Sequence, residues 1–290
     1  MLRRLLSRLP PVPKSRLRGF YLARKKRFVD AFLSYDSGEL ERALDKLGLR
    51  QGDTVLVHSS FNPYSGFQGS PENLIDVFLK TVGPEGNLLM VSLPYSTSSI
   101  SYLQKLKLFD VRKTPSRMGM ISELFRRRPG VLRSLHPTHP MLAYGPKAEW
   151  IVAGHEDCLY PCGPGTPFEK LAQLNGKILF FYVGFTYLTF FHYLEHLVHQ
   201  KLPFPLYTDK PFDVPVIDGN GKERTVKTYV FTPDAIRRRR PDPLQRDFWR
   251  RGVIKKGRVG ATKLLLVDAN KAIASALDMV RRGVFFYRLS

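Results

Sequence analysis

Residues Gly38–Ser60 read GELERALDKLGLRQGDTVLVHSS, and this stretch decides the fold class. Apolar residues at helical spacing predict a helix over Gly38–Leu47, which Gly48 ends. A Gly-Asp turn follows, and the apolar, β-rich run Asp53–Val57 predicts a strand. A helix that leads directly into a buried strand is typical of a layered α/β domain.

The rest of the chain continues this alternation of helices and strands. Helices are expected over Pro71–Val82, Met120–Arg127, Lys147–Ala153, Thr189–His199 and Lys271–Val280, and strands over Asn87–Ser92, Lys177–Val183 and Ala261–Val267 and between Val214 and Val230. We therefore predict a single layered α/β domain over residues 37–290, with a central sheet and helices packed on it. Residues 1–36 are expected to form a separate, basic helical arm.

Positive charge is concentrated in two segments. The 290 residues carry 46 basic and 25 acidic side chains, a net charge of +21. Ten of the basic residues lie in residues 1–28 without an acid, and ten more lie in residues 237–258. Within residues 1–9, leucines fall on one helical face and arginines on another, which predicts an amphipathic helix suited to an anionic membrane surface. A second basic helix is expected over about residues 15–33. A field of this sign attracts anions such as coenzyme phosphates, nucleotide sugars, nucleic acid or anionic lipid, and it repels polycations.

Cysteine usage and hydropathy limit the class of protein. Cys158 and Cys162 are too few for a disulfide framework, and their spacing lacks the second pair that a zinc site needs, so we expect two free thiols and no metal. The most apolar uncharged run, Ile178–Leu194, is shorter than the roughly 20 residues that a bilayer requires. Basic residues and prolines interrupt any apolar core of a secretory signal. We expect a cytoplasmic protein whose basic arm can contact the inner membrane face.

Five segments carry a family resemblance. They are Leu47–Ser60, LGLRQGDTVLVHSS; Thr114–Phe125, TPSRMGMISELF; Pro129–Gly145, PGVLRSLHPTHPMLAYG; Tyr160–Leu171, YPCGPGTPFEKL, which runs into Gly176–Glu195, GKILFFYVGFTYLTFFHYLE; and Gly257–Leu265, GRVGATKLL. They resemble the aminoglycoside 3-N-acetyltransferase family, which is distinct from the GNAT acetyltransferases, and we expect the resemblance to extend over residues 40–285. The resemblance implies an N-acetyltransferase that moves an acetyl group from acetyl-CoA to an amino group of an aminoglycoside or amino sugar.

Such a transfer needs a neutral amine at neutral pH, so a base must take the proton of the ammonium group. Histidine suits this role at neutral pH. The resemblance places the catalytic histidine at His136, in the sequence HPTH. It also places the helix of Glu195 beside the active site, where this carboxylate either orients His136 or holds the substrate amine. His192 lies three residues before Glu195, so both point to one side of that helix. His139 and His192 are assigned to the acceptor, although His139 can equally be structural.

Coenzyme A brings phosphates and a pantetheine arm to the predicted site. Anions bind where backbone N–H groups are unpaired at a helix start, and the expected helix over Met120–Arg127 begins directly after a polar segment that contains a glycine. Two serines follow the predicted strand Asp53–Val57, at the end of the sheet that usually carries the site. The residues assigned to the coenzyme are Ser59, Ser60, Ser116, Arg117, Met118 and Gly119.

Departures from the family pattern leave the acceptor open. Pro140 stands where the family usually has serine, and an acidic residue common near Thr186 is absent, although Thr186 is still assigned to the acceptor. An alternative acceptor is a nucleotide- or lipid-linked amino sugar of surface polysaccharide synthesis. A second class of protein, a non-catalytic binder of RNA or anionic membrane on this fold, is favoured by the basic segments, but the candidate site residues count against it. The segment His192–His196 also spells H-x-x-E-H, a metalloprotease motif that the family resemblance explains better.

Overall fold

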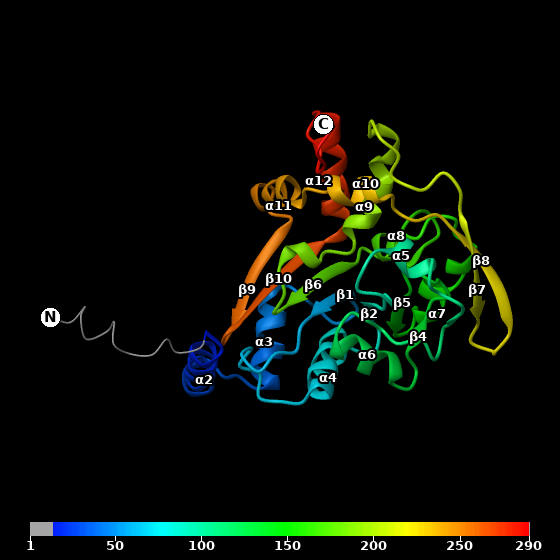
Figure 1. Ribbon diagram of the computed structural model, residues 1–290. Coiled ribbons are helices and arrows are strands. Elements are labelled where there is room, and N and C mark those ends of the chain that lie inside the picture. The colour runs from blue at the N-terminus through cyan, green and yellow to red at the C-terminus, as the bar shows by residue number, and fades with distance from the viewer. Residues whose placement is uncertain (1–13, 290) are drawn as a thin grey trace.

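The computed structural model describes residues 14–289, and its centre is a seven-stranded mixed sheet (Figure 1). The strand order is β4-β5-β2-β1-β6-β10-β9. Strand β1 (Thr54–Ser59) is parallel to both neighbours, β2 (Asn87–Val91) and β6 (Lys177–Phe181). The outer strands β4 (Leu132–Arg133), β5 (Met141–Tyr144), β9 (Ile254–Val259) and β10 (Thr262–Asp268) pair antiparallel. The predicted α/β class with a central sheet is confirmed.

Helices cover both faces of this sheet, so its central strands are buried on both sides. In β1, Val55 and Val57 pack into one hydrophobic cluster and Leu56 into the other. The first cluster includes residues of α3 (Ser37–Leu47), α4 (Pro71–Val82) and α6 (Met120–Arg127). The second includes residues of α7 (Ala148–Val152), α8 (Pro167–Gln173), α9 (Phe191–Val198), α11 (Pro241–Arg250) and α12 (Ala269–Arg281). The bounds expected for α4 and α6 coincide with the observed helices.

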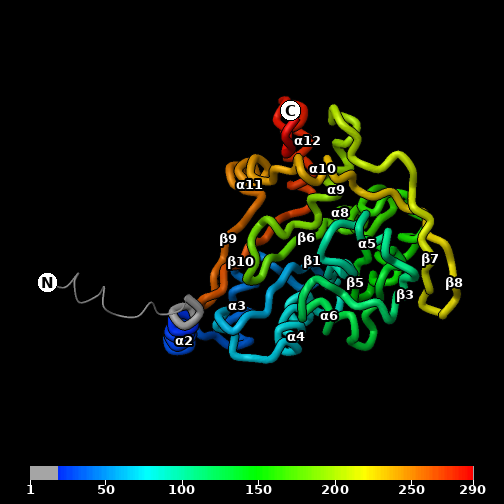
Figure 2. Tube along the Cα trace, in the orientation of Figure 1, coloured from blue at the N-terminus to red at the C-terminus, as the bar shows by residue number. Residues whose placement is uncertain are grey.

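A smaller sheet lies at one side of the molecule. It contains β3 (Phe109–Asp110), β7 (Phe212–Ile217) and β8 (Glu223–Thr228), and its hairpin lies across the molecule from the N-terminal helix (Figure 2). Two short helices, α5 (Ser99–Leu103) and α10 (Pro233–Arg238), lie in the connections. In the large sheet, strand β5 and strand β9, which forms a hairpin with β10, were not expected from the sequence.

The N-terminal helix α2 (Lys14–Phe32) occupies the expected second basic helix. Its C-terminal end is fixed to the β9–β10 turn, where the Ala261 N–H donates to the Leu33 carbonyl over 3.1 Å. The amphipathic helix expected over residues 1–9 lies outside the described residues. Among residues 14–289, no helix is both long enough and apolar enough to cross a membrane.

Candidate functional site

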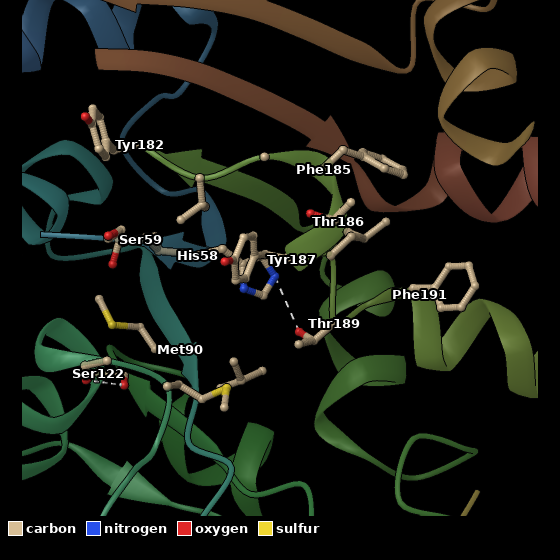
Figure 3. Close-up of a pocket in the computed structure, with 18 of the residues that line it drawn as sticks. His58, Ser59, Met90, Ser122, Tyr182, Phe185, Thr186, Tyr187, Thr189 and Phe191 are labelled. Atoms are coloured by element: carbon tan, nitrogen blue, oxygen red, sulfur yellow. Dashed lines mark hydrogen bonds between the residues drawn. The ribbon is translucent and has the colours of Figure 1, made fainter. Parts of the chain in front are cut away.

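A pocket of about 840 Å³ opens at the carboxyl ends of the three parallel strands. Val91 ends β2, Ser59 ends β1, and Tyr182 follows β6, and all three line the pocket. Parallel strands bring their carboxyl ends to one edge of a sheet, and α/β sheets carry their ligand sites at that edge. Figure 3 shows the lining residues Ser59, Met90, Ser122 and Tyr182 on one side of the close-up and Thr186, Thr189 and Phe191 on the other.

Two backbone features shape the pocket wall. Tyr182 has a φ of 57°, a left-handed conformation that is uncommon for a residue with a side chain. Gly119 has a φ of 100° and is the N-cap of α6, and a Cβ built there would meet nothing within 4 Å. Helix α6 has no side-chain cap hydrogen bond at this end. Its first N–H groups are therefore available to an anion or a carbonyl oxygen in the pocket.

The polar centre of the pocket wall is His192, which contacts the buried carboxylate of Glu195 behind it. His192 lines the pocket, and its Nδ1 lies 2.7 Å from Oε2 of Glu195. Both side chains stand on α9, one helical turn apart, and Glu195 is fully buried. A neutral imidazole whose Nδ1–H donates to a carboxylate has its Nε2 lone pair free to accept a proton.

Glu195 is held by two further groups from the C-terminal part of the chain. Arg239 donates from Nε and Nη2 to the two carboxylate oxygens over 2.6 and 2.9 Å, and the Tyr287 hydroxyl donates to Oε1. Burial alone would raise the pKa of Glu195, but Arg239 and His192 outweigh burial and hold it below its usual value. The carboxylate is therefore ionised, and its position is fixed from three sides.

The same surroundings keep His192 neutral. Burial lowers the pKa of its imidazole and Arg239 lowers it further, while Glu195 acts in the opposite direction. The resulting pKa lies below the usual 6.5, so the unprotonated form predominates at neutral pH. A buried, neutral imidazole with a fixed carboxylate behind it is suited to accept a proton from a group in the pocket.

A second histidine in the wall, His58, serves a different purpose. Burial lowers its pKa to about 3, and its Nε2 lies 3.4 Å from the Thr189 hydroxyl, the contact drawn in Figure 3. Its ring packs 5.3 Å from that of Phe180. His58 therefore joins the end of β1 to the segment before α9 and keeps this wall in place.

Six of the residues expected at the site line this pocket. They are Ser59, Ser60, Met118, Gly119, Thr186 and His192. Ser116 and Arg117 do not line it. The Ser116 hydroxyl lies 3.0 Å from that of Ser122 and its N–H donates to Glu123, so it supports the turn before α6. Arg117 is exposed, and its N–H donates to the Leu93 carbonyl.

His136 and His139 are buried behind the pocket rather than in its wall. His136 is fully buried, and its Nδ1 accepts the N–H groups of Thr138 and His139 over 3.3 and 3.1 Å. Its ring stacks on His155 at 4.4 Å. We expected Glu195 to orient His136 or to bind the substrate amine; instead, Glu195 is inaccessible and contacts His192, Arg239 and Tyr287. The ring of His139 lies near both histidines, 6.4 Å from that of His136 and 5.6 Å from that of His192.

Sequence reasoning did not find Arg239, Tyr287 or Tyr187. Arg239 belongs to the run Arg237–Arg240, which we interpreted only as part of a basic segment that attracts anions. Its neighbour Arg238 pairs with Asp234, whereas Arg239 forms a strand-like bridge with Tyr287 and donates to Glu195. Arg239 and Tyr187 line the pocket. Among residues 14–289 there is also no group of three or more potential metal ligands, and Cys158 and Cys162 are free thiols.

Comparisons with known proteins show which family the chain resembles in sequence and in fold. A family model described as aminoglycoside 3-N-acetyltransferase matches residues 56–281. Aminoglycoside N(3)-acetyltransferase III of Salmonella is 27% identical over 202 residues, 66% of this chain and 70% of the relative. The solved structure of sisomicin-bound AAC-VIa has a TM-score of 0.70 at 27% identity and covers 87% of this chain and all of that one. AAC-IIIb with CoASH has a TM-score of 0.71 at 25% identity, over 86% of this chain and 97% of that chain.

Proposed function

Because the chain belongs to the aminoglycoside 3-N-acetyltransferase family, we propose that the pocket binds the acetyl donor beside an amine and that His192 is the base. Family membership confirms the predicted class, an acetyltransferase that uses acetyl-CoA. The acceptor is an amino group of an aminoglycoside or amino sugar, since relatives carry this activity in their names and AAC-VIa binds sisomicin. The observation that supports the proposal is that His192 lines the pocket while its Nδ1 contacts the buried Glu195.

The donor fits the side of the pocket between β1 and α6. Ser59 and Ser60 offer hydroxyls at the end of β1, and Met118 and Gly119 precede the uncapped start of α6. A thioester arm and its amides need hydroxyl and N–H partners of this kind, and phosphates favour a helix start. The open backbone at Gly119 permits a close approach of such a group.

In the proposed reaction, His192 carries one proton from the amine to the leaving thiolate. The neutral amine attacks the thioester carbonyl, and a C–N bond forms as the carbonyl oxygen takes the negative charge. His192 Nε2 accepts the proton that the nitrogen loses, while Glu195 stabilises the imidazolium through Nδ1–H. The tetrahedral intermediate collapses, the C–S bond breaks, and the thiolate of coenzyme A takes up the proton.

Replacement of His192 by Gln tests this assignment. A general base contributes about 10² to 10⁴ in rate, so kcat should fall by that factor while coenzyme A binding by calorimetry is retained. The matched control is His199→Gln, because His199 stands at the end of the same helix but does not line the pocket. Full kcat in His192→Gln, together with a large loss in His136→Gln, would return the base to His136.

Helix α2 is the part of the described structure that is best suited to contact a membrane. Phe20, Phe28 and Phe32 lie at four-residue multiples on one face, with 64%, 57% and 73% of their surface exposed. Arg24 lies over the Phe20 ring at 5.5 Å, and Asp30 is the acid of this helix. We propose that this face contacts anionic lipid, because aromatic and basic side chains together suit the headgroup region. A second copy of the chain is a less suitable partner for this face, because its basic helix would repel the basic side chains of α2.

A further inference from the structure

The polar lining of the pocket is unusual for a site that would take a polycation. Among the described residues, its polar side chains are the hydroxyls of serine, threonine and tyrosine, two imidazoles and the guanidinium of Arg239. The nearby carboxylate, Glu195, is fully buried and already paired with Arg239. The pocket wall therefore presents hydrogen-bonding groups that are neutral or positive.

We infer that the acceptor is a sugar with a single amino group whose other substituents are hydroxyl or anionic, rather than a polycationic aminoglycoside. This inference rests on the proposed function and names its substrate class. Each additional ammonium group that enters the pocket loses its hydration. No carboxylate in the pocket wall compensates for this loss, and the positive potential there repels the group. Only the reacting amine avoids this cost, because it enters the reaction as the neutral base and its proton passes to His192.

Aromatic and hydroxyl groups beside His192 suit a sugar ring. Tyr187 lines the pocket with 62% of its surface exposed, so its ring is available as a platform for the apolar face of a sugar. Thr186 and Thr189 lie in the same segment and offer hydroxyls to those of the ligand (Figure 3). A pocket of about 840 Å³ has space for both a thioester arm and one such ring.

The net charge of +21 acts in the same direction over a longer range. It raises the local concentration of anionic acceptors and lowers that of polycations, and the effect decreases as salt screens it. A phosphate on the sugar should therefore increase the rate of association, whereas additional ammonium groups should decrease it.

The test compares three acceptors with acetyl-CoA and the full-length protein. They are glucosamine, glucosamine 1-phosphate and sisomicin, and the readout is thiol release with product mass. We expect kcat/KM for both monoamino sugars to exceed that for sisomicin by at least tenfold, with the phosphate derivative the better of the two at low salt. A higher kcat/KM for sisomicin than for both sugars would overturn the inference and leave the acetyltransferase assignment intact. Failure to acetylate any of the three would contradict both.

A gain-of-function variant separates pocket charge from general charge. Thr186→Asp places a carboxylate in the pocket wall, and we expect the ratio of kcat/KM for sisomicin to that for glucosamine to rise about tenfold, the size of one hydrogen bond between charged groups. Thr225→Asp adds the same charge on an exposed position of β8, outside the pocket. An equal ratio in the two variants would refute the role of pocket charge.

Tyr187 provides a second, independent readout. Tyr187→Ala should raise KM for glucosamine about tenfold with little change in KM for acetyl-CoA, and Tyr187→Phe should restore it because the ring face is kept. An unchanged KM for the sugar in Tyr187→Ala would remove the stacking platform from the inference.

Discussion

Replacing Arg239 by Gln should destabilise the protein far more than replacing its neighbour Arg238. Arg239 makes two hydrogen bonds to Glu195, which is 0% exposed, and only 20% of the Arg239 side chain is exposed. Loss of one partner leaves a buried carboxylate without its countercharge, a change that typically costs about 3–5 kcal/mol. His192 and Tyr287 still contact Glu195, so we expect the lower end of this range.

The expected loss corresponds to a large shift of the unfolding midpoint. For a domain approaching this size, 1 kcal/mol moves Tm by about 2–4 °C, so Arg239→Gln should lower Tm by roughly 6–12 °C. The control, Arg238→Gln, removes a pair with Asp234 whose side chains are 29% and 45% exposed. Exposed pairs contribute about 0–1 kcal/mol, so its Tm should change by less than roughly 4 °C.

A double-mutant cycle then isolates the pair. Glu195→Gln alone leaves Arg239 buried and unpaired, whereas Glu195→Gln with Arg239→Gln leaves two neutral amides that can bond to each other. We expect the double variant to be less destabilised than the sum of the singles, with a coupling of about 2–3 kcal/mol measured by urea denaturation. Equal Tm losses for Arg239→Gln and Arg238→Gln, or strict additivity in the cycle, would show that the Glu195–Arg239 contact is not the anchor described here.

Three further predictions concern pH, coenzyme and membrane. Because burial and Arg239 lower the pKa of His192 while Glu195 raises it, and His139 faces its ring at 5.6 Å, the acid limb of kcat should lie below pH 6.5. Arg239→Gln should move that limb to higher pH and Glu195→Gln to lower pH; shifts of the same sign would exclude this account. Arg117→Ala should change the Kd for coenzyme A by less than about threefold, because Arg117 does not line the pocket, and a loss of about 1.5–3 kcal/mol would instead return Arg117 to the coenzyme site. Finally, the protein should sediment with anionic liposomes at low salt and be released near about 0.5 M salt. Deletion of residues 1–28 should abolish this sedimentation but leave turnover unchanged. Equal binding to neutral liposomes would contradict the membrane contact.

The layered fold was predictable because its signals are local. The β-rich run before Ser59 becomes β1, and the expected helices α4 and α6 have the observed bounds. Each of these elements buries one or both of its faces, so the spacing of apolar residues in the sequence indicates where it lies. Strand β5 was missed because it is only four residues long, Met141–Tyr144, and follows a proline. Strand β9 was missed because its sequence, IKKGRV, reads as a charged loop, and its pairing with β10 is what makes it a strand.

The pocket was predictable in part, for the same reason. Ser59, Gly119 and Thr186 follow a strand or precede a helix, and the ends of such elements can be located from the sequence. The burial of His136, which we predicted as the catalytic base, could not be read from the sequence. A histidine in a polar loop motif looks accessible, yet the backbone N–H groups of its own turn bind its Nδ1 and its ring is fully buried. Burial of this kind depends on what packs over the loop, which the local sequence does not record.

The choice of base depends on contacts between distant parts of the chain. The spacing of His192 and Glu195 already placed both on one side of a helix, but a helical His and Glu at that spacing are common and carry no function alone. What distinguishes this pair is the fixation of Glu195 by Arg239 and Tyr287, 44 and 92 residues further along the chain. These contacts form only when the C-terminal segment returns across α9, and Arg239 sits among three other arginines with nothing local to single it out. A carboxylate fixed in this way can orient and stabilise an imidazolium without being able to take the proton itself, because Arg239 keeps its pKa low. In the proposed reaction the proton therefore stays on His192 until the thiolate leaves, as an acyl transfer between an amine and a thioester requires.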